Sequence, residues 1–504
     1  MRPVFLLSLV LFWIAPLSAR NLETYQPAEV VLGQPGFTTK AASSSATGLT
    51  FPIAIAIDPT TGKVFVSTGE SVVRYGSATS LASGSAAEAI LGQDDFNSSE
   101  SGTGANRFGG SVYGICVDRF GRLWVADRTN HRVLRFDNAS NLASGAGADR
   151  VLGQINFFTN ASAFSATAMN SPRSVSMDPS GTLWVADSGN HRVLGFRNAA
   201  GLGSGSAADI VLGQTTFNAQ SSGLSQSKFN NPSGVFADSE GDLWVSDSDN
   251  RRVLRFASVT SYAANTTGPN ATAVIGQVNF TTSTPGLSAN LIGFHYPVAL
   301  DNKGNLFVPA ITHSRVLVFP DASSILSGGT ASVVLGQPDF ATSAALNPPT
   351  ARSLAAPTGV AFDAEWNAWV TDSSNSRVLR FRTIFNTAKL SAKPAKSSVS
   401  PGATKKIRFL AQNTTTIAGD YLFSSKVKKG GGFKVKFSFS GKNVTAAVKK
   451  GTALSRIPAG RKAILTATVR AGSAGKLKLP VTVTPSNNPG EKASAKATVK
   501  VAVP

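Results

Sequence analysis

Most of the chain consists of short runs in which apolar and polar positions alternate with period two, separated by turn residues. Residues 172–196 show the pattern most clearly: an alternating run ends at Asp178, a turn closes at Gly181, and two apolar runs follow at 183–187 and 192–196. Aspartate at the start of a turn can hydrogen-bond to its own backbone, and glycine supplies the positive φ that many turns require. The pattern therefore predicts three consecutive β-strands joined by tight turns.

A fourth strand is marked by the tripeptide Leu/Ile-Gly-Gln, which recurs at intervals of about 60 residues. Its glycines are Gly33, Gly92, Gly153, Gly213, Gly276 and Gly336, and a phenylalanine follows each of them at the same distance. Three-strand units lie at 52–75, 110–136, 172–196, 232–256, 297–319 and 357–381, the first and fifth being degenerate. Four antiparallel strands repeated at this period are typical of β-propeller blades.

The order of these elements predicts how the ring closes. The first Leu-Gly-Gln strand, at 30–34, precedes the first three-strand unit, whereas none follows the last unit, which ends at Phe381. Six complete blades therefore require the N-terminal strand to join the last one. Closure of this kind removes two sheet edges that would otherwise promote aggregation. The sequence thus predicts an all-β fold with a six-bladed β-propeller closed by an N-terminal strand.

The segment 172–196, with its Pro-x-x-Val, Leu-Trp-Val-Ala-Asp and Asn-x-Arg-Val-Leu-x-Phe elements, resembles the NHL repeat. The resemblance extends over about residues 28–382, with four good copies and two weaker ones. It implies a six-bladed ring, the number that the six tags give independently. We assign the propeller to residues 28–385.

Composition changes sharply after residue 385. From residue 386 onward 23 Lys and Arg stand against two acidic residues, a net charge of +21, whereas the first 385 residues carry a net charge of −1. Alternating runs, for example those at 405–410, 433–439, 463–469 and 479–483, indicate half-exposed strands, and we expect some seven short strands in this part of the chain. We expect a linker at 386–396 and a Lys-rich, immunoglobulin-like β-sandwich at 397–504, similar to modules appended to bacterial secreted proteins.

The N-terminus has the layout of a secretory signal peptide. Arg2 precedes a mostly apolar run from Val4 to Leu17, and Ala19 offers a small residue for cleavage. The run is short for a membrane anchor. We expect residues 1–19 to be a signal peptide and the protein to be secreted, extracellular or periplasmic. The single cysteine, Cys116, cannot form an intramolecular disulfide, and its apolar surroundings favour an inert thiol.

Ligands of propellers usually bind on the face that carries the hairpins between the second and third strands and the crossovers between blades. All four histidines map to this face. The candidate binding residues are His131, His191, His295, Tyr296, His313 and Arg251. Some relatives of this propeller type are lyases with a histidine-held metal, so convergent imidazoles would indicate a metal site. His131 and His191 occupy the same repeat position, however, and equivalent positions in a ring need not converge, so we predict no metal ligands and no cofactor.

No residue is predicted to be catalytic. Four Asp-x-x-Asn-x-Arg hairpins, at 127–132, 187–192, 247–252 and 372–377, recur in different blades, which favours ion pairs that brace the hairpins over a catalytic carboxylate pair. Four tryptophans, at 124, 184, 244 and 369, recur in the same way and are interpreted as packing between blades. Nucleophile elbows, phosphate-binding loops and Cys/His clusters are absent from the sequence.

The favoured function is a non-catalytic binding or scaffolding module whose ligand, an unknown protein, peptide or glycan, binds the hairpin and crossover face. The alternative is an extracellular lyase or lactone hydrolase that uses the same face, with or without a histidine-held metal. The basic C-terminal domain is suited to an anionic surface polymer, with solubility as the competing interpretation of its lysines. A leader peptide and the lack of interleaved aromatic residues disfavour nucleic acid.

Overall fold

The computed structural model describes residues 22–383, 388–413, 419–427, 432–457, 461–471, 475–485 and 493–501. The chain divides into two compact units on either side of the boundary between Thr383 and Ile384. The expected signal peptide, residues 1–19, lies outside the described residues. No helix in the described ranges has the length and apolarity needed to cross a membrane.

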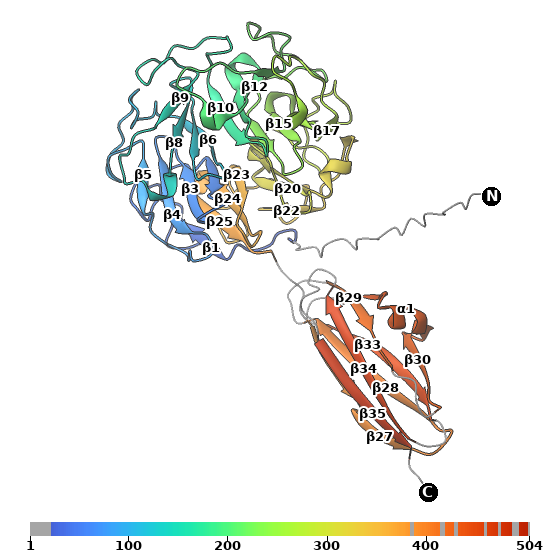
Figure 1. The fold of residues 1–504 in the computed structure, drawn as a ribbon. Coiled ribbons are helices and arrows are strands. Elements are labelled where there is room, and N and C mark those ends of the chain that lie inside the picture. The colour runs from blue at the N-terminus through green and yellow to red at the C-terminus, as the bar shows by residue number, and fades with distance from the viewer. Residues whose placement is uncertain are drawn as a thin grey trace, which may run out of the picture. The chain divides into compact units, whose positions relative to one another are not determined.

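The first unit, residues 22–383, contains six antiparallel sheets, each built from four main strands (Figure 1). The first sheet is formed by β2 (Ala54–Ile57), β3 (Lys63–Ser67), β4 (Val72–Ser77) and β5 (Ala89–Leu91), and the second by β6 (Val112–Val117), β7 (Leu123–Asp127), β8 (Arg132–Phe136) and β9 (Arg150–Leu152). The third sheet is formed by β10 (Pro172–Met177), β11 (Leu183–Asp187), β12 (Arg192–Phe196) and β13 (Ile210–Leu212), and the fourth by β14 (Gly234–Ala237), β15 (Leu243–Asp247), β16 (Arg252–Phe256) and β17 (Ala273–Ile275). The fifth sheet is formed by β18 (Ala299–Leu300), β19 (Leu306–Ala310), β20 (Arg315–Phe319) and β22 (Val333–Leu335), and the sixth by β23 (Pro357–Phe362), β24 (Ala368–Asp372), β25 (Arg377–Phe381) and β1 (Val30–Leu32). A short strand, β21 (Ser327–Gly328), runs parallel to β17.

The sixth sheet combines the two ends of this unit. Strand β1 pairs with β25 in antiparallel register, so that Val30, Val31 and Leu32 lie opposite Arg380, Leu379 and Val378. The backbone hydrogen bonds of β25 that would otherwise face solvent are thereby made by the N-terminal segment.

In four of the six sheets the turn between the first two strands is fixed by one aspartate and one tryptophan. The Asp178 carboxylate accepts hydrogen bonds from the backbone of Ser180 and Thr182 and from Nε1 of Trp184 at 3.0 Å. The same bond joins Asp118 to Trp124, Asp238 to Trp244 and Asp363 to Trp369. Each tryptophan is buried in a cluster shared with the next sheet around the ring, which confirms the interpretation of these residues as packing between sheets.

Successive sheets contact one another, and the sixth contacts the first. Hydrogen bonds between neighbouring sheets join Ser67 to the Tyr113 carbonyl, Val235 to Ser174, Ser246 to the Tyr296 carbonyl, and Thr358 to the Pro52 carbonyl. Trp124 packs against residues of the third sheet, and the rings of Phe307 and Phe362 join the fifth to the sixth. In Figure 1 the sheets surround a common centre.

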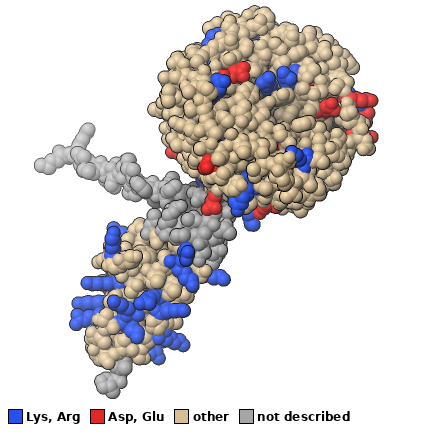
Figure 2. Space-filling view, turned by 180° about the vertical axis from the view of Figure 1, so that it is seen from behind, with Lys and Arg blue, Asp and Glu red and all other residues tan. Residues whose placement is uncertain are grey.

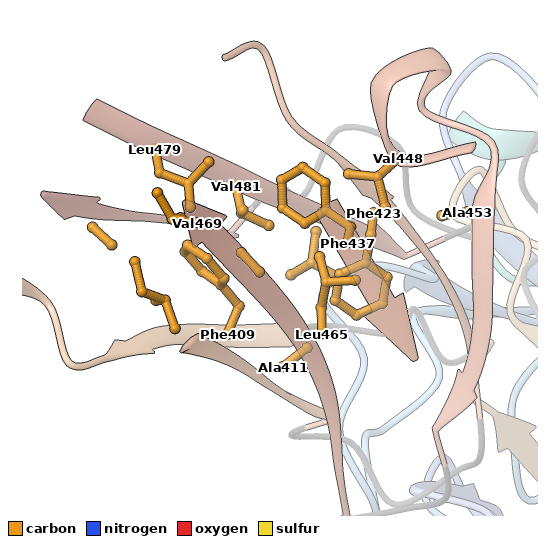
Figure 3. Close-up of a cluster of buried hydrophobic side chains, with 14 of the residues drawn as sticks. Phe409, Ala411, Phe423, Phe437, Val448, Ala453, Leu465, Val469, Leu479 and Val481 are labelled. Atoms are coloured by element: carbon orange, nitrogen blue, oxygen red, sulfur yellow. The ribbon is translucent and has the colours of Figure 1, made fainter. Parts of the chain in front are cut away.

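The second unit consists of two five-stranded sheets and one short helix. The first sheet has the order β26 (Ala388–Lys393), β28 (Thr404–Asn413), β33 (Lys462–Arg470), β30 (Lys434–Phe439), β31 (Lys442–Asn443). The second has the order β27 (Lys396–Val399), β35 (Ala493–Val501), β34 (Lys476–Pro485), β29 (Gly419–Ser424), β32 (Ala453–Ile457). The helix α1 spans Thr445–Lys450. Residues of both sheets and of α1 form one apolar core, in which Phe409, Phe423 and Phe437 are fully buried (Figure 3).

Two expectations for this unit are wrong. Residues 386–396 were expected to be a linker, but β26 occupies 388–393 and pairs with β28, and β27 begins at Lys396. The described residues of this unit contain ten strands instead of some seven. The short edge strands lack the long alternation of the central strands, so they were not predicted. Alanine, serine and lysine suit an exposed connection, but lysine is equally typical of edge strands, and both β26 and β27 lie at sheet edges.

Candidate functional site

A central cavity of about 340 Å³ is lined by the first strand of every sheet in the first unit. Its walls are almost entirely apolar or small, with residues such as Ile55, Ile115, Val175 and Leu300, and they carry no charged side chain. Small residues allow neighbouring first strands to approach: a Cβ atom added at Gly234 would lie 2.4 Å from the Cα atom of Pro297. The cavity is therefore suited to apolar groups and offers no acid or base.

Two tyrosines meet at the end of the cavity where the first strands begin. Tyr113 precedes the lining residue Gly114, and Tyr296 precedes the lining residue Pro297. Their rings stack with centroids 6.1 Å apart and an interplanar angle of 26°. Because Tyr113 belongs to the second sheet and Tyr296 leads into the fifth, the pair joins opposite sides of the ring. Phe294 contacts the Tyr296 ring edge-on at 5.9 Å.

Two arginines flank this tyrosine pair. The guanidinium carbon of Arg128 lies 5.3 Å from the centroid of the Tyr113 ring, and that of Arg173 lies 5.8 Å from it. In both arginines Nε is buried without a hydrogen-bond partner, and neither residue forms an ion pair within the described part of the chain. We call Tyr113, Arg128, Arg173 and Tyr296 the mouth cluster. Its positive charge has no neutralising carboxylate, which favours an anionic ligand.

Tyr296 of the mouth cluster is poorly suited to act as a base. Burial raises the pKa of Tyr296 well above its usual value, and the neighbouring Tyr113 raises it further, outweighing the opposite effect of Arg173 and Arg128. A phenol that stays protonated can donate a hydrogen bond to a ligand oxygen, but it cannot accept a proton at neutral pH.

The predicted residues His131 and His191 brace neighbouring sheets. Nδ1 of His131 accepts a hydrogen bond from the Ser171 backbone at 2.9 Å, and Nδ1 of His191 accepts one from Asn231 at 3.0 Å. Burial lowers the pKa of both imidazoles, which keeps them neutral. The equivalent residue of the fourth sheet, Arg251, donates to the Ser283 carbonyl at 3.3 Å. These three side chains occupy equivalent positions around the ring, each with its own partner, and do not converge on a common site.

The remaining predicted residues lie in different surroundings. His295 is fully buried, with Nδ1 3.1 Å from the Gly293 carbonyl, so it does not present itself to a surface ligand. His313 is half-buried against Gly293, and its Nδ1 has no hydrogen-bond partner. Tyr296 alone among the six predicted residues lies in the mouth cluster. Within the described residues no group of three or more His, Cys, Asp or Glu is arranged to hold a metal ion.

Tyr113, Arg128 and Arg173 were missed because they were treated as ordinary repeat positions. Tyr113, Arg173 and Tyr296 occupy the fifth position before the turn aspartate, where the other units have Ile53, Ser233 and Thr358. Arg128 follows the hairpin aspartate, where Ser188, Ser248 and Ser373 stand in other sheets. The sequence did contain a signal: tyrosine or arginine stands at positions where the other units have serine, threonine or isoleucine.

The hairpin Asp–Arg pairs are structural, as the sequence predicted. Salt bridges join Arg132 to Asp127, Arg192 to Asp187, Arg252 to Asp247 and Arg377 to Asp372, with Nε–Oδ2 distances of 2.8, 2.7, 2.7 and 2.6 Å. All eight side chains are fully buried. Burial raises the pKa of the four carboxyls, to about 6 at Asp247, against the opposing effect of the arginines. Cys116 lines the cavity, and burial likewise raises the pKa of its thiol, which makes it inert.

Solved structures similar to this chain include a virginiamycin B lyase from Staphylococcus aureus, with 12% identity, 66% of this chain and 80% of that chain covered, and a TM-score of 0.35. They also include a streptogramin B lyase, with 11% identity, coverage of 66% and 93%, and a TM-score of 0.36. The PapD-like domain 7 of human CEP192 matches with 14% identity, coverage of 22% and 83%, and a TM-score of 0.16. Likenesses this distant carry no statement about what this chain binds.

No curated protein sequence matches the chain. The NHL repeat family model matches residues 114–136, 169–196 and 229–256, which lie in the second, third and fourth sheets. The chain therefore contains NHL repeats.

Proposed function

We propose that residues 22–383 form a six-bladed β-propeller, closed by β1, that acts as a non-catalytic binding module for a carboxylate-bearing glycan or peptide. Six four-stranded sheets, each contacting the next, and the β1–β25 pairing support this architecture. The ligand would bind on the hairpin and crossover face.

One observation carries the proposal: Arg128 and Arg173 both lie over the Tyr113 ring, and neither forms an ion pair with a carboxylate of the described residues. An arginine fork matches a carboxylate in geometry and charge, and the bond is stronger when water is partly excluded. Tyr113 and Tyr296 add flat, amphipathic surface and hydroxyl donors beside this charge.

The alternative is a lyase or lactone hydrolase using the same face. Such chemistry needs a group that takes a proton near neutral pH. Burial raises the pKa of Tyr296 further away from that range. Nδ1 of His131 and Nδ1 of His191 each already accept a hydrogen bond from a backbone N–H. The site therefore favours binding over turnover.

The test is binding of acidic and neutral oligosaccharides and peptides, followed by isothermal titration of the best acidic ligand. We expect the double substitution Arg128→Gln and Arg173→Gln to weaken that ligand at least tenfold. Arg119→Gln is the matched control, because Arg119 also packs over an aromatic ring, Phe120, but in a turn at the other end of the first strands. Equal loss in the control, or conversion of the ligand to product, would contradict the proposal.

For the second unit we propose an immunoglobulin-like sandwich that contacts an anionic surface polymer outside the cytoplasm, after removal of residues 1–19. Its charge supports this: Lys and Arg side chains crowd its surface in Figure 2, with almost no acidic residues among them. One face of the sheet that contains β28, β33 and β30 is basic. On this face Lys434 lies opposite Arg470, and Lys406 and Lys436 lie on either side of Thr468.

A further inference from the structure

Five of the six sheets in the first unit bury a guanidinium group beneath their crossover loop. In the third sheet Arg192 donates to the carbonyl oxygens of Ser165, Ala168 and Phe217. The same set of three loop carbonyls receives bonds from Arg132, Arg252, Arg315 and Arg377 in the second, fourth, fifth and sixth sheets. All five arginines are fully buried.

The first sheet has a serine at this position. Val72 pairs with Leu91 as Val133 pairs with Leu152, so Ser71 stands where the second sheet has Arg132, and Thr68 stands where it has Asp127. Both members of the ion pair are thus replaced, and the Ser71 hydroxyl lies 2.8 Å from that of Thr68 instead of donating to the loop.

The loop above Ser71 nevertheless keeps the fold of its counterparts. The bond from Ser43 to the Leu49 carbonyl matches that from Gly102 to Phe108, and the bond from Ala87 to Ala46 matches that from Ala148 to Ala105. By this correspondence the carbonyls of Ser45, Gly48 and Phe96 take the places of those that accept from arginine elsewhere. Within residues 22–383 no donor bonds to the carbonyl oxygen of Gly48 or of Phe96.

A cavity of about 220 Å³ lies where the other sheets hold the arginine head group. Its lining includes Ser71 and Thr68 together with Ser45 and Gly48, and its only charged lining residue is Glu70. Phe51, whose side chain is 56% exposed, contributes an aromatic ring to the lining. The cavity therefore combines two of the three loop residues of an arginine site with a carboxylate and an aromatic face, and carbonyl, carboxylate and ring all attract a planar cation.

We propose that this pocket binds the guanidinium group of an arginine side chain carried by a partner peptide or protein. The occupant would donate to the loop carbonyls as the chain's own arginines do in the other five sheets, and Glu70 would supply the opposite charge. The site is independent of the mouth cluster, which has the opposite charge preference.

The proposal is tested by titrating the full chain with N-acetyl-arginine methylamide, with its citrulline isostere, and with the corresponding lysine compound. We expect saturable binding of the arginine compound, at least tenfold tighter than either of the others, because citrulline lacks the charge and lysine the planar fork. No saturable binding of the arginine compound, or equal binding of the three, overturns the proposal.

The substitution Ser71→Arg places a guanidinium of the chain's own in the pocket, which Ser71 lines. We expect this variant to bind the arginine compound at least tenfold more weakly, with an unchanged or raised melting temperature. The fifth sheet shows that a buried arginine is tolerated here without an aspartate partner, because Arg315 is fully buried opposite Ala310. Glu70→Gln provides a second, milder variant that should weaken the arginine compound several-fold. Glu240→Gln, an exposed turn residue, is its matched control. Undiminished binding in either Ser71→Arg or Glu70→Gln overturns the proposal.

Discussion

Tyr113 and Tyr296 stack on each other across the ring, 6.1 Å between centroids, although one belongs to the second sheet and the other leads into the fifth. The aromatic contact of Phe307 with Phe362, by contrast, joins the neighbouring fifth and sixth sheets. The tyrosine pair therefore ties together elements that no repeat interface connects, and it covers one end of the central cavity.

The first prediction concerns this pair. Tyr113→Ala and Tyr296→Ala should each lower the free energy of unfolding, and the double variant should lose less than the sum of the two. Stacked aromatic pairs contribute about 0.5–1.5 kcal/mol beyond their burial, which is the expected coupling. Chemical denaturation of the four chains measures it. Additive losses would show that the rings are neighbours without mutual stabilisation.

A second prediction uses the incomplete hairpin of the fifth sheet. Arg315 is fully buried, its Nε has no hydrogen-bond partner, and burial lowers its pKa to about 10, because Ala310 stands where other sheets have aspartate. Ala310→Asp should place a carboxylate beside this guanidinium and stabilise the fold by about 2 kcal/mol, typical of charged hydrogen bonds. Thermal unfolding measures the gain, and Ala310→Asn controls for size. A variant no more stable than the asparagine control would mean that desolvation of the new carboxylate cancels the bond.

The third prediction is a pH dependence of stability. Burial lowers the pKa of His295 to about 4 from its usual 6.5, although the hydrogen bond to Gly293 acts in the opposite direction. The unfolded chain therefore takes up a proton at this position as pH falls through 6.5, while the folded chain takes it up only near pH 4. Stability from this group is fully present above pH 6.5 and is lost between pH 6.5 and 4, by about 3 kcal/mol.

His295→Asn keeps a donor toward the Gly293 carbonyl but cannot titrate. From pH 7 to pH 4 the chain with His295 should lose about 3 kcal/mol of unfolding free energy relative to the chain with asparagine. Burial also lowers the pKa of His131, His191 and His313, so the difference between the two chains, and not the slope of either, isolates His295. A difference that is constant with pH would mean that His295 titrates normally.

A fourth prediction tests the role of β1. Removing residues 28–36 from the chain should expose the edge of β25 and cause aggregation or loss of cooperative unfolding. Unfolding followed by intrinsic fluorescence, together with light scattering, measures both outcomes. Melting indistinguishable from that of the intact chain would mean that β1 contributes nothing to the integrity of the ring.

The strands of the repeats could be predicted from sequence because the same local rule, an aspartate turn followed by an apolar run, recurs in each unit. Residues 388–393 were misjudged because an edge strand tolerates the same lysines and alanines as a linker. The mouth cluster was harder to predict. Arg128, Arg173 and Tyr113 are exceptions to the repeat, and only the ring geometry brings Tyr296 to them. Sequence periodicity specifies what the sheets share, whereas a binding site arises where they differ.

The last prediction concerns the charge of the second unit. Lys406, Lys434 and Lys436 are exposed on β28 and β30, where Ile407 and Phe437 alternate with them and point into the core. Replacing the three lysines with glutamine should leave the fold intact and reduce the salt concentration needed to elute the chain from heparin. The matched control replaces Arg119, Arg150 and Arg197, three exposed arginines of the first unit, with glutamine. Both variants lose three positive charges, so an effect of net charge alone would lower retention equally, and that result would contradict a docking face on the second unit. Selective loss in the lysine variant, with binding that falls steeply as the Debye length shrinks to about 8 Å at physiological salt, is expected for a charged face that contacts an anionic polymer.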